Sequence, residues 1–242
     1  FFTLAMVLIM LAAFTKSAQV PFYIWLPDAM EAPTPVSAYL HSATMVKAGL
    51  YLIARMTPIF AASQGWIWTV TLVGLITLFW ASLNATKQQD LKGILAFSTV
   101  SQLGMIMAML GIGAISYHYQ GDDSKIYAAA FTAAIFHLIN HATFKGALFM
   151  ITGAVDHSTG TRDVKKLGGL LTIMPISFTI TVITALSMAG VPPFNGFLSK
   201  ESFLETTFTA SQANLFSVDT LGYLFPIIGI VGSVFTFVYS IK

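Results

Sequence analysis

Residues 66–86 read WIWTVTLVGLITLFWASLNAT, a stretch without a single charged side chain. A helix that crosses the hydrocarbon core of a bilayer needs about 20 such residues. Charge returns at Lys87 and Asp90, shortly after the stretch ends. The stretch therefore predicts one membrane-spanning helix that ends near a membrane surface.

The composition extends this prediction to the whole chain. Its 242 residues are 56% hydrophobic and only 9% charged, whereas soluble domains are about one quarter charged. None of the apolar runs shows the sustained alternation of a membrane β-barrel. We therefore expect an all-α, polytopic membrane protein. Because Phe1 lies inside an apolar run, we also expect the chain to be a piece of a longer protein.

The charge balance and the cysteine count exclude several classes of function. A formal net charge of +2 gives no indication of a nucleic acid or an acidic substrate. The sequence contains no cysteine. The chain therefore holds no disulfide, no thiolate metal site and no iron–sulfur ligand.

The same length rule predicts about seven crossings along the chain. These crossings are Phe1–Met30, Pro35–Thr57, Trp66–Thr86, Leu91–His118, Lys125–Val155, Leu171–Glu205 and Leu221–Lys242. The connections between them carry turn residues and charge, and Asp156–Gly169 and Thr206–Thr220 are among them.

Two crossings contain a proline-centred interruption beside a lysine. Gln19-Val-Pro-Phe22 follows Lys16, and Gly190-Val-Pro-Pro-Phe-Asn-Gly196 precedes Lys200. Proline removes a backbone donor and clashes with the preceding turn. At Pro21 the residues alone favour an ordinary kink, whereas the second segment favours a true break. Interruptions in corresponding parts of two halves are typical of inverted-repeat transporters, in which unwound backbone lines a polar path.

The distribution of basic residues predicts the orientation in the membrane. Most of the lysine and arginine outside the helices lies in the loops 87–90 and 156–169 and at their edges, whereas the opposite loops hold mainly Arg55 and Lys125. By the positive-inside rule, the first two loops are predicted to be cytoplasmic, in a cell membrane.

The clearest candidate site is His137-Leu-Ile-Asn-His141-Ala-Thr-Phe-Lys145 in the fifth crossing. A spacing of four places His137, His141 and Lys145 on one narrow helix stripe. A lysine at the centre of a membrane helix costs roughly 2.5–3.5 kcal/mol, so something must offset it. Histidine titrates near neutrality and burial lowers the pKa of lysine, so the stripe could pass protons along with interposed water.

Other interpretations of this stripe stay open. The histidines could only bond neighbouring helices while Lys145 reaches an interface. A zinc site at His137 and His141 is the weaker alternative, because no third ligand is apparent.

Single basic residues in the other crossings are further candidates. Lys47 has long apolar flanks on both sides, which favours a functional role. Lys16 and Lys200 flank the two interruptions, where an interfacial anchor is about as consistent with their position as a function. His41 lies six residues before Lys47 and off its helical face, so a lone polar histidine in the core is equally consistent. Lys92 is interpreted as the partner of the nearby Asp90 at a helix end.

Read in order, the motifs resemble a known family. The segments that carry this resemblance are 15–21, 25–38, 41–47, 90–92, 98–104, 137–145 and 190–201. The chain resembles, essentially from end to end, the proton-conducting antiporter-like membrane subunits of respiratory complex I, membrane hydrogenases and multisubunit Mrp-type Na⁺/H⁺ antiporters. In residues 156–163 it is most similar to the large A subunits of the Mrp type.

The resemblance implies a role for each matching residue. Residues 1–57 would form the end of one repeat and residues 66–242 a second repeat. The family's glutamate partner of Lys16 would precede Phe1. The implied proton path comprises the lysines of the two broken helices, one adjacent acid, the polar positions between them and the central relay: Lys16, His41, Lys47, His137, His141, Lys145, Lys200 and Glu201.

The resemblance also implies a function. The leading hypothesis is an ion-translocating subunit that exchanges Na⁺ for H⁺ together with other membrane subunits, as a secondary transporter and not an enzyme. The alternative is a proton-pumping membrane subunit of a quinone-reducing complex or a hydrogenase. A carrier of an organic solute has less support, because no pocket signal is evident. No cofactor is expected on this chain in any of these cases.

Overall fold

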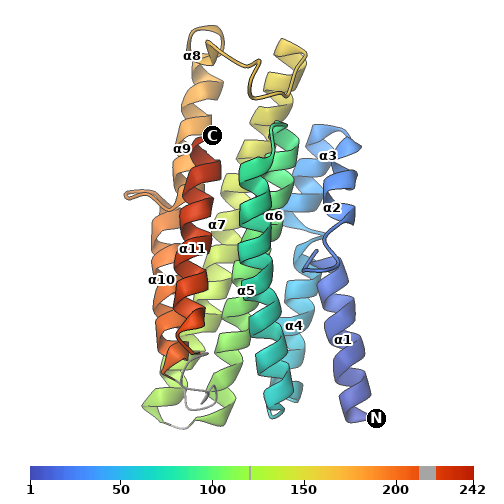
Figure 1. Cartoon of the computed structure of the whole chain (residues 1–242), viewed down its shortest axis with the longest axis vertical. Coiled ribbons are helices and arrows are strands. Elements are labelled where there is room, and N and C mark those ends of the chain that lie inside the picture. The colour runs from blue at the N-terminus through green and yellow to red at the C-terminus, as the bar shows by residue number, and fades with distance from the viewer. Residues whose placement is uncertain (120, 213–221) are drawn as a thin grey trace.

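The computed structural model describes residues 1–119, 121–212 and 222–242. Within these ranges the regular structure is helical, apart from one isolated bridge between Asp90 and Asp163. Most of the helices run along the long axis of the molecule (Figure 1). This confirms the all-α prediction.

Among the described residues, four helices are long and apolar enough to cross a membrane. They are α5 (Gln64–Lys87), α6 (Leu91–Gly113, extended by the 3₁₀ turn η3 to His118), α7 (Asp122–Thr159) and α11 (Leu224–Ile241). The shorter elements are α1 (Phe2–Lys16), α2 (Trp25–Asp28), η1 (Ala29–Glu31), α3 (Thr34–Ala38), η2 (Tyr39–Ala43), α4 (Lys47–Phe60), α8 (Leu170–Ile173), α9 (Pro175–Ala189) and α10 (Asn195–Ser211). The predicted connection at 206–220 lies largely outside the described residues.

Within the described residues, several of the shorter elements arise because the chain leaves the helix inside a predicted crossing. Both proline segments are true interruptions, at 17–24 and 190–194, so the interpretation of Pro21 as an ordinary kink is wrong. There Ala18 adopts a left-handed φ of 51° and helix does not resume before Trp25. A third interruption, at 44–46, follows the π-helical turn η2 and was not predicted, because it contains neither proline nor glycine.

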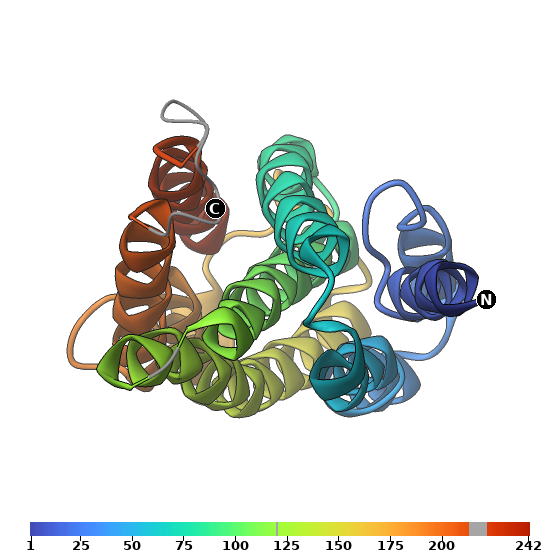
Figure 2. The same ribbon diagram turned by 90° about the horizontal axis from the view of Figure 1, so that it is seen from below.

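The packing is centred on α6, which is almost entirely buried. Figure 2 shows α5, α6 and α7 in the middle, with α1 and α4 on one side and α10 and α11 on the other. Glycines allow α5 and α6 to approach closely. A Cβ atom added to Gly74 would lie 2.4 Å from the backbone nitrogen of Ala108, and one added to Gly104 would lie 2.6 Å from that of Leu78.

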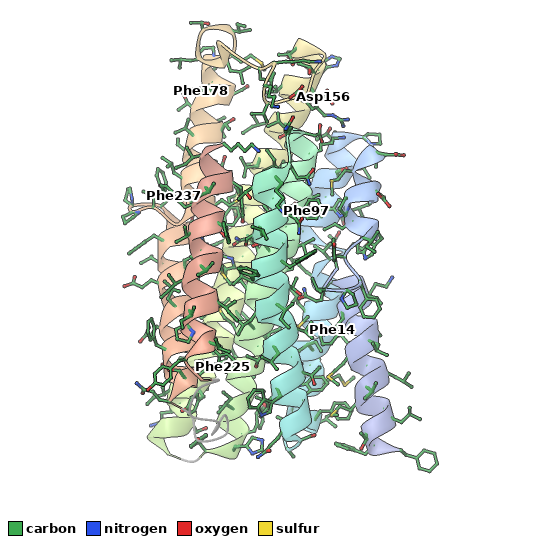
Figure 3. The ribbon with its side chains drawn as sticks, viewed as in Figure 1. Phe14, Phe97, Asp156, Phe178, Phe225 and Phe237 are labelled. Carbon is green, nitrogen blue, oxygen red and sulfur yellow. The ribbon has the colours of Figure 1, made fainter. Side chains whose placement is uncertain are left out.

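The outer surface is apolar along the helices. Phe178 and Phe237, labelled in Figure 3, are exposed on α9 and α11, whereas Phe14 and Phe225 are buried. Exposed aliphatic and aromatic side chains along most of the helices are expected of a protein that lipid surrounds.

The two loops with most of the basic residues lie together at one end of the bundle. Leu91 donates its backbone hydrogen to the Arg162 carbonyl (3.0 Å), and Val164 donates to that of Gln89 (3.0 Å). The guanidinium of Arg162 pairs with the carboxylate of Asp90 at 3.2 Å. This pairing holds the loop 156–169 against the start of α6.

Lys92 and Asp90 do not pair with each other, so this prediction is wrong. The Asp90 carboxylate caps α6 by accepting from the Gly93 nitrogen (2.9 Å). Lys92 is buried and donates to the carbonyls of Ala32 (2.9 Å) and Met30 (3.3 Å). Residues near the start of the helix point in different directions, which separates the two charges.

Replacing Gly74 by alanine tests the close contact of α5 and α6. Alanine favours helix by about 1 kcal/mol over glycine, but its methyl group would overlap the backbone of α6, and overpacking costs about 1–3 kcal/mol. We therefore expect a lower unfolding temperature of the full-length protein purified in detergent. Gly168→Ala is the control, because a Cβ atom there meets nothing within 4 Å. A gain in stability for Gly74→Ala would contradict this packing.

Candidate functional site

The predicted stripe of α7 lies inside the protein. The side chains of His137, His141 and Lys145 are all fully buried, at 0% exposure. The face that carries them packs against α6 and α10. The stripe therefore faces other helices of the protein, and Lys145 does not reach the surface of the bundle.

His137 has a partner on each ring nitrogen. Its Nδ1 lies 2.9 Å from the Ser199 hydroxyl on α10, and its Nε2 lies 2.8 Å from the side-chain oxygen of Gln102 on α6. The imidazole therefore connects three helices through polar contacts.

The other two members of the stripe differ in their contacts. The Lys145 amine donates to the hydroxyl of Ser98 and to the Leu95 carbonyl (3.4 Å), both on α6. Neither ring nitrogen of His141 has a hydrogen-bond partner among the described residues. Buried polar groups are nearly always paired with protein or ordered water. His141 is therefore the member of the stripe that has room for a further polar partner.

Lys47 joins the stripe from α4. It is the first residue of that helix, directly after the interruption at 44–46, and its side chain is 7% exposed. Its amine donates to the carbonyl of Leu138 at 2.9 Å, one residue after His137. The unpredicted interruption thus starts a new helix at the lysine. His41, in the π-helical turn before it, is also buried and packs beside Trp25 and Phe149.

Lys200 joins the stripe from the second interruption. Its buried amine donates to the carbonyl of Ala189 at 2.9 Å, at the end of α9. Gly190 has a φ of +79°, and a Cβ atom at this position would lie 2.5 Å from Cδ of Lys200. Glycine is needed here both for the backbone conformation and for the passage of the lysine side chain.

Asparagine side chains fasten this interruption to α7. The amide of Asn195 donates to the side-chain oxygen of Asn140 (3.0 Å), and the amide of Asn140 donates to the backbone carbonyl of Asn195 (3.1 Å). Ser187, near the end of α9, donates to the Asn195 side chain (2.6 Å). The break between α9 and α10 is therefore held one turn from His137.

Two residues of the implied path lie elsewhere. Lys16, the last residue of α1, is exposed, and so is Glu201, although its neighbour Lys200 is buried. Adjacent residues of a helix point about 100° apart, which explains why Lys200 and Glu201 separate. Neither Lys16 nor Glu201 contacts the buried row within the described part of the chain.

An open cleft of about 720 Å³ lies at the loop end of the bundle. Its lining includes Glu31, Asp90, Lys92, Asp156 and Arg162. Among the described residues, no three histidine or acidic side chains are arranged as metal ligands. The zinc interpretation therefore has no third ligand within this part of the chain.

The family described as "NADH:quinone oxidoreductase/Mrp antiporter, TM" matches residues 1–225. This chain belongs to that family. It is 98% identical, over all 242 residues, to the Na⁺/H⁺ antiporter subunit A1 of one Staphylococcus aureus strain and 97% identical to that of another. The chain spans 30% of the length of these relatives.

Two solved structures contain the same fold. One is an Mrp complex from a Dietzia species, with a TM-score of 0.85 and 42% identity over 98% of this chain and 24% of that chain. The other is a membrane-bound sulfane sulfur reductase, an archaeal respiratory membrane complex. Its TM-score is 0.78, with 27% identity over 97% of this chain and 44% of the other.

Gln102, Ser199 and Asn140 are the members of this antiporter-family site that the list of candidate residues omits. Asn140 lies inside the histidine motif, three positions after His137 on a helix, so its spacing was a usable signal. Gln102 and Ser199 are polar residues in apolar surroundings, a weaker signal. Nothing in the sequence indicates which helix each of them contacts.

Asn140→Leu tests whether the bonds from α7 hold the interruption between α9 and α10 in place. The substitution removes both bonds to Asn195 and leaves buried polar groups unpaired, at a cost of about 1–3 kcal/mol. We expect a lower unfolding temperature of the full-length protein, and faster hydrogen exchange at residues 190–196. Asn84→Leu is the matched control, because the Asn84 amide donates only within its own helix, to the Trp80 carbonyl. Equal effects of the two substitutions would contradict the assigned role of Asn140.

Proposed function

We propose that this chain is part of the ion-translocating subunit of a multisubunit Na⁺/H⁺ antiporter, in which protons move through a hydrated path lined by lysine and histidine. The observation that supports this most is the buried polar row from Lys47 through the α7 stripe to Lys200. The relatives that bear the antiporter name are nearly identical over this chain. The remainder of the longer protein, the bilayer and other membrane subunits would complete the path.

The chemistry of the row fits proton transfer. Each of the three buried amines has a carbonyl acceptor, so each can remain charged inside the bundle, and water entry or exit changes how easily it keeps its proton. Each ring nitrogen of His141 could bind a water molecule of its own without displacing a protein partner. Protons would pass between Lys47, the α7 stripe and Lys200 as these groups are alternately hydrated.

The exposed members of the implied path have a place in this proposal. Lys16 and Glu201 would lie near the two ends of the row, where other parts of the longer protein or neighbouring subunits cover them. A charge that faces lipid at mid-membrane is costly, which supports a protein cover. His41 would act near Lys47 on the side of the first repeat.

The proposal includes a topology of about seven crossings. Residues 1–57 would end the first repeat and residues 66–242 would form the second, each with a broken helix. The loops 87–90 and 156–169 would be cytoplasmic. Their mutual hydrogen bonds support a shared side of the membrane, and their basic residues support the cytoplasmic side.

A second candidate function is a proton-pumping subunit of a redox-driven membrane complex. The observation that favours it is the structural similarity to the sulfane sulfur reductase. The two candidates differ in their driving force, since only the pump needs an electron donor. In both, this chain is a transport subunit without a cofactor, and an organic-solute carrier has no specific support.

Substitution of Lys200 tests the proposed path. A coupling amine must lose its proton, whereas arginine stays charged, so both Lys200→Ala and Lys200→Arg should lower Na⁺-driven proton exchange about tenfold or more, which is about 1.4 kcal/mol or more in the barrier. The assay is exchange in everted vesicles without an electron donor, at matched amounts of complex. Lys166→Ala, at an exposed lysine, is the control. Normal exchange with Lys200→Arg would refute the coupling role.

Labelling tests the proposed sidedness. The sequence contains no cysteine, so a single introduced cysteine is the only thiol in this chain. Ser158→Cys, in an exposed position, should react with an impermeant maleimide in everted vesicles and not in intact cells. Tyr117→Cys, at the other end of α6, should behave in the opposite way. If Ser158→Cys were labelled in intact cells, the loop 156–169 would be external and the proposed orientation would be wrong.

A further inference from the structure

The two ring nitrogens of His137 face different kinds of partner. Nε2 meets the side-chain oxygen of Gln102, which can only accept a hydrogen bond. Nδ1 meets the Ser199 hydroxyl, which can either donate or accept. The ring is fully buried, so these contacts do not compete with bulk water.

The orientation of the Gln102 amide depends on Tyr239. The amide nitrogen of Gln102 donates to the Tyr239 hydroxyl at 3.1 Å. A phenol can also donate, but the Tyr239 hydroxyl is bonded to Ser101 as well, and Ser101 pairs with Ser82, whose own hydrogen goes to the Leu78 carbonyl (2.6 Å). The hydrogen of Tyr239 is therefore directed to Ser101, its oxygen accepts from the Gln102 amide, and the amide oxygen faces His137. Both side chains are buried, and Tyr239 reaches the amide from α11. If the amide turned over, its nitrogen would donate to Nε2 of His137, which could then carry no hydrogen.

The orientation of this amide decides whether His137 can become charged. A protonated imidazole donates from both nitrogens, so it needs the oxygen of Gln102 on one side and the oxygen of Ser199 on the other. Ser199 can supply its oxygen because its hydrogen has a second acceptor, the Gly196 carbonyl at 3.2 Å. With the amide turned over, two donors would face each other at Nε2.

The charged neighbours of His137 do not assist its protonation. The titratable groups around it are Lys47 on α4, His141 and Lys145 on α7, Lys200 on α10 and Tyr239 on α11. The lysines repel a positive imidazole, and none of these groups is an aspartate or a glutamate. The neutral oxygens of Gln102 and Ser199 are therefore what the structure offers to a protonated His137.

We propose that Gln102, held in place by Tyr239, is a positioning residue that keeps a hydrogen on Nε2 of His137, so that this histidine gains and loses its proton at Nδ1, the nitrogen that faces Ser199 on α10. The inference rests on the proposed proton path and adds a direction to it. Proton uptake at Nδ1 turns the Ser199 hydroxyl from His137 to Gly196. Release reverses the turn, and no covalent bond other than N–H and O–H changes.

Substitutions at one position should move the pH dependence in opposite directions. As a carboxylate, Gln102→Glu presents only acceptors to His137 and adds a negative charge, which favours the protonated imidazole. The acidic limb of Na⁺/H⁺ exchange by the full complex should then move to higher pH. Gln102→Leu removes the acceptor, and Tyr239→Phe lets the amide turn over, so both should move the limb to lower pH by one unit or more. General damage to the fold would lower exchange at all pH values alike.

Thr99→Val is the control for removing a polar group from α6. The Thr99 hydroxyl is buried and donates within its own helix, to the Leu95 carbonyl (2.8 Å), so its loss should leave the pH profile in place. Shifts of equal sign for Gln102→Glu and Gln102→Leu would overturn the positioning role.

A spectroscopic measurement separates this inference from the proposed function. In the histidine-¹⁵N-labelled full complex, the His137 signals are assigned by their loss in His137→Gln. We expect hydrogen on Nε2 in the wild type and on Nδ1 in Tyr239→Phe. An unchanged tautomer in Tyr239→Phe would overturn the inference. A changed tautomer with unchanged exchange would support the positioning role and remove His137 from the proposed path.

Discussion

Amines buried within a lipid-solvated bundle require acceptors, and helices offer few of them. Almost every carbonyl of an unbroken helix is already bonded within the helix, and lipid supplies none. Lys200 obtains its acceptor at the end of α9, where the helix stops and its last carbonyls are free. Lys145 uses a hydroxyl of α6 for the same purpose. The interruption at 190–194 and the buried Ser98 therefore serve the same purpose. Each supplies an acceptor for a lysine amine in apolar surroundings.

This requirement also explains the central position of α6. Three of its buried polar residues, Lys92, Ser98 and Gln102, are spaced by six and four positions. Lys92 reaches the Ala32 carbonyl just before α3, whereas Ser98 and Gln102 both reach α7. Ser98 and Gln102 meet Lys145 and His137, so two polar stripes face each other along antiparallel helices. Because α6 is surrounded by other helices on nearly all sides, at least one neighbour must pack very close to it. The glycines between α5 and α6 provide that approach and leave the rest of α6 for α7.

The sequence predicts the long helices well and the contacts between them poorly. Apolar runs with charges at their ends locate α5 within about two residues, since Trp66–Thr86 was predicted and Gln64–Lys87 is observed. The break before Lys47 has no such marker, because Thr44, Met45 and Val46 are ordinary helix residues and the interruption comes from packing. Burial of the α7 stripe follows from its period, but the pairing of His137 with Gln102 depends on how two helices are rotated. Single-sequence patterns do not contain that rotation.

His137 and His141 occupy successive turns of α7 and yet have opposite environments. His137 is bound on both sides, so its orientation is fixed and the position of its hydrogen is linked to Gln102 and Ser199. His141 has no bonded nitrogen among the described residues, so moving its proton breaks no protein hydrogen bond. A relay made only of fixed groups would pay for each transfer with a lost bond, whereas one made only of free groups would not control direction. In the proposed path, an ordered histidine beside an unbound one would meet both needs, and the burial of both would keep the transfer within the row.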